Sequence, residues 1–180
     1  MSRKRISRDD MFIQIVQVVA QRSTCLRSQV GALIVRDGRI VSMGYNGPVS
    51  GMPECKEIPS FVDLVSDPAY YDRPMSKIID ELENDPLKCE GPGCTRSLHA
   101  ETNAIAFAAR AGVSVSGCTL YCSMSPCINC AKVIVNSGIC EVKFLEKYRN
   151  EDGINLLIRS GIKVVDLGEG VVLSEKRSCQ

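Results

Sequence analysis

Two short motifs with metal-binding and acidic side chains constrain this chain more than any other feature. The first is His99-Ala100-Glu101, and the second is Ser125-Pro126-Cys127-Ile128-Asn129-Cys130. His99 is the only histidine in the sequence. One imidazole and two thiolates give zinc three protein ligands, which leaves the fourth tetrahedral position for water. Glu101 is poorly placed to bind the same ion but well placed to move protons beside it.

Each motif is predicted to open a helix. In the second motif, Ser125 fits the N-cap and Pro126 fits the first helical position, so Cys127 and Cys130 share one face. The first motif leads into a predicted helix over residues 99–110. Two helix N-termini would then face the metal, and their positive ends favour thiolate and hydroxide. A lone C-x-x-C can be a redox pair, half of a structural zinc site or chance, but the two motifs together favour catalytic zinc.

Length and composition indicate one domain with a substantial core. The 180 residues include 22 basic and 21 acidic side chains, so a broad polyanion-binding surface is not expected. Residues 11–20 form an apolar run, but Gln14 and Gln17 interrupt it as in an amphipathic helix, not a signal peptide. No stretch approaches the length of a membrane span. Ten cysteines without an export signal favour metal ligation and a location in the cytoplasm, or in the host cytoplasm if the gene is viral.

Strands alternate with helices along most of the chain, which predicts an α/β fold with a partly parallel sheet. Asp37-Gly38 marks a hairpin between strands over residues 29–35 and 39–44, so the sheet should be mixed. The first helix should cover residues 8–22, with an apolar stripe of Met11, Ile15, Val18 and Val19. Further strands are expected over residues 119–123, 141–145 and 163–166, and further helices over 127–137 and 152–160.

Residues 51–95 carry repeated prolines and fit an extended loop region laid over the core, as a lid or an interface. A short helix over residues 76–83 is the one element expected there. We therefore expect one domain over residues 1–168 that contains this inserted region. Residues 169–180 should form a polar tail with at most a weak strand.

The run Gly44-Tyr45-Asn46-Gly47 follows the second expected strand. Its two glycines let the backbone turn sharply and approach a ligand. Asn-Gly is also common in ordinary turns, and spacing alone favours a turn.

With these motifs in place, the sequence resembles the deoxycytidylate (dCMP) deaminases of the cytidine deaminase superfamily, from about Arg8 to Asp166. The H-A-E and P-C-x-x-C pair is the superfamily signature of zinc nucleobase deaminases. The S-T-C-L-R run and the G-Y-N-G loop point to dCMP deaminases, which favours a ligand-binding role for that loop. The resemblance is carried by Ser23-Thr24-Cys25-Leu26-Arg27, Val30-Gly31-Ala32, Gly44-Tyr45-Asn46-Gly47, His99-Ala100-Glu101, Asn103-Ala104-Ile105, Ser125-Pro126-Cys127, Cys130-Ala131-Lys132 and Tyr148.

The resemblance implies a three-layer α-β-α fold with a mixed five-stranded sheet. It also implies hydrolytic deamination of dCMP to dUMP and ammonia, which supplies dUMP for thymidylate synthesis. His99, Cys127 and Cys130 would hold catalytic Zn²⁺, and Glu101 would transfer protons. Substrate contacts would come from Asn46, Ala100, Ser125 and Tyr148. Arg27 and Ser28 are candidates for the phosphate, although a solvated loop explains them equally well.

Relatives in this family also suggest a second, structural Zn²⁺. Its ligands here would be Cys25, Cys55, Cys89 and Cys94, since four thiolates suit a closed tetrahedral site. The alternative is that some of these are merely buried thiols, as expected for Cys118, Cys122, Cys140 and Cys179.

The resemblance further implies a homohexamer that dCTP activates and dTTP inhibits, each with Mg²⁺. Gly44, Tyr45, Asn46, Gly47 and Arg110 are the candidate regulatory residues. An unregulated enzyme, in which the loop only shapes the active site, is the alternative.

Other functions are a deaminase of another cytosine nucleotide or nucleoside or of single-stranded nucleic acid, and a non-catalytic zinc-binding module. A polynucleotide editor should show a basic groove and added aromatic residues. This chain is nearly neutral and has no tryptophan, so no stable nucleic-acid complex is expected. A non-catalytic module would not need Glu101.

Overall fold

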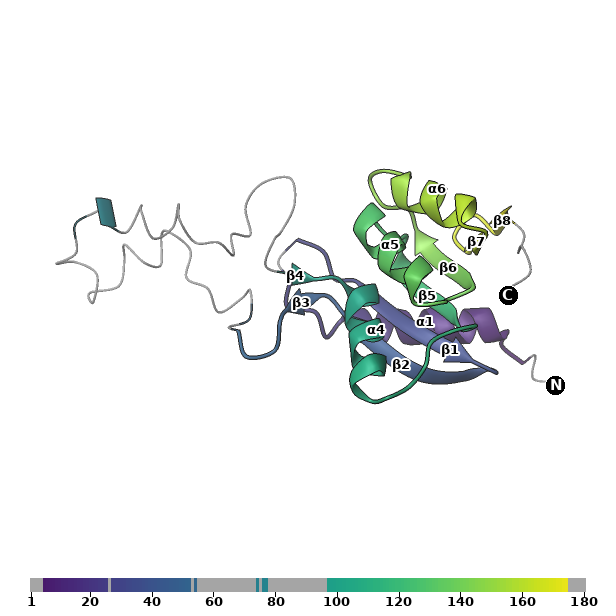
Figure 1. Ribbon diagram of the computed structural model, residues 1–180, viewed down its shortest axis with the longest axis horizontal. Coiled ribbons are helices and arrows are strands. Elements are labelled where there is room, and N and C mark those ends of the chain that lie inside the picture. Colours follow the sequence, from purple (N-terminus) through teal and green to yellow (C-terminus); the bar gives the residue numbers. More distant parts are fainter. Residues whose placement is uncertain are drawn as a thin grey trace.

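The computed structural model describes residues 5–25, 27–52, 54, 74, 76–77 and 97–174. Its principal sheet has the order β2-β1-β5-β6-β7-β8, and Figure 1 shows the elements along the chain. The elements are α1 (Arg8–Ala20), β1 (Gly31–Arg36), β2 (Arg39–Tyr45), β3 (Gly47–Pro48), β4 (Ser97–Leu98), α4 (Ala100–Arg110), β5 (Thr119–Met124), α5 (Ile128–Asn136), β6 (Glu141–Glu146), α6 (Asp152–Arg159), β7 (Lys163–Asp166) and β8 (Val171–Ser174).

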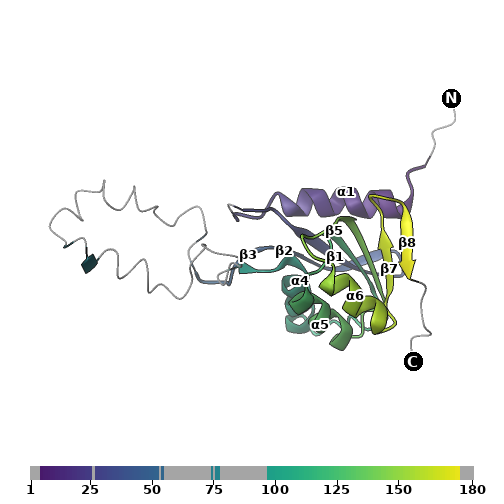
Figure 2. The ribbon, with the colours of Figure 1, turned by 90° about the horizontal axis from the view of Figure 1, so that it is seen from above.

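The layers are those expected from the sequence. Helix α1 covers one face of the sheet, while α4, α5 and α6 lie on the other (Figure 2). Strands β5, β6 and β7 are parallel, and the pairs β1–β2, β1–β5 and β7–β8 are antiparallel. The mixed sheet and the α-β-α arrangement are therefore confirmed.

The strand count differs from the expected five. The described part of the principal sheet has six strands, because Val171–Ser174 pairs with β7 at the edge. This segment lies in the region that the sequence predicts as a polar tail. Hydrophobic Val171, Val172 and Leu173 suit a half-covered edge strand.

Helix α1 begins as predicted but buries a different face. The Ser7 hydroxyl accepts a hydrogen bond from the Asp10 backbone N–H, and the helix ends at Ala20, two residues before Arg22. The predicted stripe is wrong at Val18, which is 63% exposed, whereas Met11, Ile15 and Val19 are partly buried and pack against the core beneath the helix. Packing of the Phe12 ring on Tyr121, at 5.0 Å between centroids, fixes the orientation of the helix. The buried residues are Phe12, Ile13, Val16 and Ala20.

The hairpin between β1 and β2 turns at Asp37-Gly38, with φ values of 50° and 72°. Positive φ at both positions is what a two-residue type I′ turn requires, and Asp-Gly supplies it at little cost. The predicted hairpin is confirmed. Strand β1 divides its side chains between two cores. Ala32 and Ile34 face the helices α4 and α5, while Leu33 packs under α1.

The region over residues 51–95, including the helix expected over 76–83, lies outside the described residues apart from a few positions. None of the described helices combines the length and the apolar character needed to cross a membrane.

A polar cluster joins α1 to the sheet. The Asp9 carboxylate accepts hydrogen bonds from Tyr121 Oη at 2.6 Å and from Lys143 Nζ at 2.8 Å. Burial on its own would raise the pKa of the Asp9 carboxyl, but the bonds from Lys143 and Tyr121 outweigh it and hold that pKa below its ordinary value. The ionised form is therefore the one that stabilises the folded state.

We expect Asp9→Asn to destabilise the protein by about 1 kcal/mol at pH 7, a low value because Asp9 is 39% exposed and solvent screens the pair. A carboxyl whose pKa is lower in the folded state than in the unfolded state stabilises the fold at pH values above its unfolded pKa of about 4. This contribution is lost as the pH falls through the folded pKa. Urea unfolding at pH 7 and pH 3 should show the difference shrinking in acid. Gln14→Ala, on the exposed face of α1, is the control, and an equal loss at both pH values would contradict the assignment.

Candidate active site

The two motifs meet in space and form a compact metal-binding cluster. One ligand atom each from His99, Cys127 and Cys130 lies within 4.8 Å of the others. The Nδ1 atom of His99 is 3.5 Å from Sγ of Cys127 and 3.3 Å from Sγ of Cys130. Zinc bonds of about 2.3 Å to sulfur and about 2.1 Å to nitrogen give a tetrahedral N–S edge of roughly 3.6 Å. Both nitrogen–sulfur distances are therefore close to those of a zinc site.

The ligands sit at the starts of two helices. His99 is the N-cap residue of α4, and Cys127 is the N-cap residue of α5. The prediction of Ser125 as N-cap and Pro126 as first helical residue is thus wrong by two positions. The physical reason is that the Ser125 hydroxyl accepts a hydrogen bond from the backbone N–H of Tyr148 at 2.8 Å. The hydroxyl therefore bonds to the loop after β6 and does not cap α5. The general prediction that both motifs open helices holds.

The two thiols are strongly coupled. A hydrogen bond with Cys130 lowers the pKa of Cys127 to about 3 and, with a smaller lowering from His99, outweighs the opposing effect of burial. The same contact with Cys127, together with burial, raises the pKa of Cys130. The lowered pKa of Cys127 favours the thiolate, which is the form of cysteine that binds a metal cation.

Glu101 occupies the first turn of α4, two residues beyond the metal ligand His99. Its side chain is only 4% exposed. Burial raises the pKa of the Glu101 carboxyl, and the nearby His99 partly opposes that rise. A buried carboxyl of this kind can hold a proton and release it, which suits general acid–base chemistry.

A cavity of about 550 Å³ opens beside this cluster, a size suited to a small organic ligand. It brings together the predicted residues Cys25, Arg27, Ser28, Asn46, His99, Ala100, Glu101, Ser125, Cys127 and Tyr148. Cys130 lies behind it with the other two metal ligands. The lining also includes residues that sequence reasoning missed, of which Lys147, Arg149 and Asn150 follow β6. Their position at the carboxyl end of a parallel strand is the signal that could have revealed them.

Asn46 braces the cavity wall through both ends of its side-chain amide. Its Oδ1 atom accepts the backbone N–H of Val30, and its Nδ2 atom donates to the carbonyl of Ser28, each at 2.8 Å. These bonds hold the loop that precedes β1. Asn46 therefore shapes the place where Arg27 and Ser28 line the cavity.

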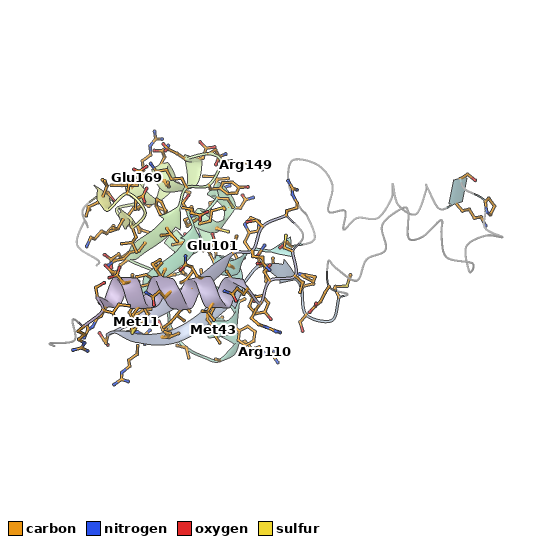
Figure 3. The ribbon with its side chains drawn as sticks, turned by 180° about the vertical axis from the view of Figure 1, so that it is seen from behind. Met11, Met43, Glu101, Arg110, Arg149 and Glu169 are labelled. Carbon is orange, nitrogen blue, oxygen red and sulfur yellow. The ribbon has the colours of Figure 1, made fainter. Side chains whose placement is uncertain are left out.

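The candidate regulatory residues fall at two places. Gly44 is buried against the first turns of α4, where an added Cβ would lie 2.4 Å from the Ala100 carbonyl oxygen. The neighbouring Tyr45 carbonyl accepts the Asn103 side chain at 2.8 Å, and Gly47 pairs with Leu98 in the β3–β4 ribbon. Arg110 ends α4 and is exposed. It is roughly 14 Å along the helix axis from Glu101, and Figure 3 shows the two residues well apart.

The second motif is also held from α6. Gly153 lies against the backbone of the Pro126–Cys127 segment, and an added Cβ would be 2.0 Å from the Pro126 carbonyl oxygen. Ser125 donates its backbone N–H to the Glu146 carbonyl at 2.7 Å. The metal-ligand loop is thus fixed between β6 and α6.

Of the cysteines expected to form a second zinc site, Cys25 is half-buried and lines the cavity. Cys55, Cys89 and Cys94 lie outside the described residues. Among the cysteines expected to be plain thiols, Cys118 and Cys122 are buried and Cys140 is half-buried, while Cys179 also lies outside the described residues.

Comparison with known proteins decides the family. The family model of the cytidine and deoxycytidylate deaminase zinc-binding region matches residues 6–146. The chain belongs to the cytidine and deoxycytidylate deaminase family.

Several known proteins are similar to this chain over most of their length. The deoxycytidylate deaminase of Enterobacteria phage T4 is 34% identical over 86% of this chain and 87% of its own. The ComE operon protein 2 of Bacillus subtilis is 33% identical over 94% of this chain and 77% of its own. The crystal structure of the dCMP deaminase from cyanophage S-TIM5 with dCMP and dUMP has a TM-score of 0.67 at 28% identity, over 90% of this chain and 98% of its own.

Proposed function

We propose that this chain is a zinc-dependent dCMP deaminase that converts dCMP and water to dUMP and ammonia. The observation that carries the proposal is the cavity that His99, Cys127 and Glu101 line together, with Cys130 behind it. The relatives named as deoxycytidylate deaminases, and the cyanophage enzyme solved with dCMP and dUMP, support the choice of substrate. The product dUMP would feed thymidylate synthesis.

The protein groups divide the chemistry between binding and proton transfer. His99, Cys127 and Cys130 would hold zinc, whose Lewis acidity lets an enzyme use water as a nucleophile near neutral pH. Glu101 would accept one proton of the attacking water and pass it to N3 of the pyrimidine, then take the second proton from the new C4 hydroxyl and give it to the departing amine. Its burial supports this role, because a carboxyl held away from bulk water can keep a proton at the pH of the reaction.

The base would be oriented by backbone groups of the two motifs. Ala100 begins α4, where the backbone N–H groups have no partner within the helix, so we assign its N–H to the pyrimidine oxygen. We assign the Ser125 carbonyl to the exocyclic amino group. The N–H and hydroxyl of Ser125 are both engaged, which fixes the orientation of that carbonyl. Asn46 and Tyr148 would face the sugar and the rest of the nucleotide.

Ammonia release from dCMP, CMP, dCTP and deoxycytidine, measured side by side, tests this proposal. We expect the highest kcat/KM for dCMP. A preference for another cytosine nucleotide or for the nucleoside would favour the alternative substrate class. The absence of turnover on all four, with zinc bound, would favour a non-catalytic zinc module.

We further propose a structural zinc held by Cys25, Cys55, Cys89 and Cys94. A structural site ties down segments that have little core of their own, so its loss should lower stability more than chemistry. We expect about two zinc ions per chain. Cys25→Ser should reduce the count by one and lower Tm, whereas Cys127→Ser should abolish activity. A count of one in fully loaded wild-type protein would contradict the second site.

Regulation by dCTP and dTTP is also proposed, within a homohexamer. The close packing of Gly44 on α4 supports a connection between a regulatory ligand and the active site. A ligand that shifts residues 45–47 would also shift α4, the helix that carries Glu101. Rates against dCMP should be sigmoidal alone, hyperbolic with dCTP and Mg²⁺, and lower with dTTP. Three superimposable curves would refute regulation and leave catalysis intact, and sedimentation would give the subunit number.

We propose one deaminase domain with the insertion at about 51–95, and the pairing of β8 with β7 moves its C-terminal boundary from the expected residue 168 to at least Ser174. A cytoplasmic location stays a prediction.

A further inference from the structure

Asp166 is a buried carboxylate at the end of β7 that the deamination chemistry does not use. The residue is only 1% exposed. Its Oδ1 atom accepts the backbone N–H of Glu169 at 3.0 Å. Its Oδ2 atom has no hydrogen-bond partner within the part of the chain that the structure describes. A buried charge is costly unless another group offsets it, so an opposite charge is needed near this atom.

Lys147 supplies that charge from the loop after β6. Its Nζ atom lies 3.7 Å from Asp166 Oδ2 and 2.8 Å from Glu169 Oε1. The chain after β7 also packs closely on the end of β6, since a Cβ added at Gly168 would lie 2.2 Å from the Leu145 carbonyl oxygen. Asp166 and Glu169 therefore hold Lys147 from a segment that cannot move independently of β6.

Lys147 lies between the two residues that hold Ser125. The Ser125 backbone N–H donates to the Glu146 carbonyl at 2.7 Å, and the Ser125 hydroxyl accepts the Tyr148 backbone N–H at 2.8 Å. Ser125 is buried, two residues before the metal ligand Cys127. Its carbonyl is the group that we assign to the exocyclic amino group of the base. A displacement of Lys147 would therefore disturb both hydrogen bonds that orient this carbonyl.

We infer that Asp166 is a positioning residue for deamination, which acts through Lys147 on the carbonyl of Ser125. The inference rests on the proposed function. Asp166 is not among the described residues that line the cavity, so its effect on the substrate is indirect. In Figure 3, Glu169 lies apart from Glu101, in agreement with an anchor outside the reacting centre. Such an anchor matters because small displacements of a group that orients the substrate lower the rate steeply.

Asp166→Asn keeps the shape of the side chain and its bond to Glu169, but it removes the charge that Lys147 matches. We expect kcat/KM for dCMP to fall by roughly 10-fold, because a shift of less than about 1 Å in Ser125 is sufficient. Lys147→Gln should cause a similar loss. The double variant should lose no more than the worse single variant, since both changes remove the same interaction. Lys147→Arg keeps the charge and should retain most of the activity. Unchanged kinetics in Asp166→Asn, or additive losses in the double variant, would overturn the inference.

Glu141→Gln is the matched control. Glu141 pairs with Lys163 Nζ at 2.9 Å. This ion pair also joins β6 to β7, but at the first register position of the two parallel strands, the end opposite to Asp166. Both changes should lower Tm, whereas Asp166→Asn alone should lower kcat/KM. An equal loss of activity in Glu141→Gln would show a general effect of stability and would refute the positioning role.

Amide hydrogen exchange measured by NMR reports on the same anchor without any substrate. The Tyr148 N–H is protected by its hydrogen bond to Ser125. In Asp166→Asn this amide should exchange several times faster, while the amide of Phe144 inside β6 keeps its wild-type rate. Wild-type exchange at Tyr148, or an equal increase at both amides, would contradict the inference.

The two measurements separate this inference from the proposed function. If the wild type releases no ammonia from any of the four cytosine compounds, but exchange at Tyr148 responds to Asp166→Asn as expected, the anchoring of Ser125 stands and the proposed reaction fails. If the wild type deaminates dCMP and neither kinetics nor exchange responds to Asp166→Asn, the reaction stands and the positioning role is refuted.

Discussion

Glu101→Gln should abolish turnover of dCMP while the protein keeps its catalytic zinc. Glutamine has nearly the same shape but cannot accept and return a proton. Loss of a positioned acid–base group typically lowers the rate by about 10²- to 10⁴-fold. Glu101 is not among the three clustered metal donors, so the zinc content should stay at the wild-type value. Ammonia release and metal analysis on the same preparation make the measurement.

Glu146→Gln is the matched control, because it makes the same chemical change on an exposed side chain of β6. Its activity should equal that of the wild type. Near-normal turnover in Glu101→Gln would refute the proton-transfer role. A loss of zinc together with activity would instead show that Glu101 supports the metal.

Gly153→Ala should damage the metal site without changing any residue that touches the substrate. The added methyl group would lie 2.0 Å from the Pro126 carbonyl oxygen and 2.8 Å from the Cys127 carbonyl carbon. Both are backbone atoms, so no rotation of a side chain can relieve the clash. Either α6 or the loop that carries Cys127 must move, and a displacement of about 1 Å at a reacting centre can lower the rate about 10²-fold.

The same substitution should lower stability. Overpacking costs about 1–3 kcal/mol, which corresponds to a Tm decrease of roughly 2–12 °C for a domain of this size. Asn155→Ala, on the exposed face of α6, should leave both zinc content and activity near wild type. Full zinc occupancy and full activity in Gly153→Ala would contradict the packing argument.

The sequence predicts the reactive centre well because its parts are local. His99 and Glu101 are two residues apart and Cys127 and Cys130 are three apart, so each pair is held together by its short spacing at the start of one helix. The approach of the two pairs follows from the motif signature, and the sulfur–nitrogen distances agree with it. Strand β7 is also predicted with its correct bounds, because an apolar run between a glycine stop and a polar loop has few alternatives.

What the sequence does not predict depends on contacts between distant segments. The sequence pattern of α1 includes the exposed Val18 and omits the buried Phe12 and Val16, because α1 is apolar on both flanks and only its packing on Tyr121 selects the buried one. The helix cap at Cys127 replaces the expected Ser125 because Tyr148, 23 residues later, uses the Ser125 hydroxyl. The need for glycine at position 153 likewise comes from packing that no local pattern encodes.

The small ribbon of β3 and β4 has a consequence for how this fold can vary. Gly47 pairs with Leu98 and Pro48 pairs with Ser97, so the chain leaves the core and returns to it at neighbouring points, directly before His99. An insertion anchored at adjacent ends can change length at a small entropic cost, since closure entropy grows only slowly with loop length. The β3–β4 ribbon therefore marks the position at which the inserted segment can be exchanged. Natural or engineered exchange of the segment between residues 49 and 96 can change the length and composition of this insertion while the register of α4 is preserved.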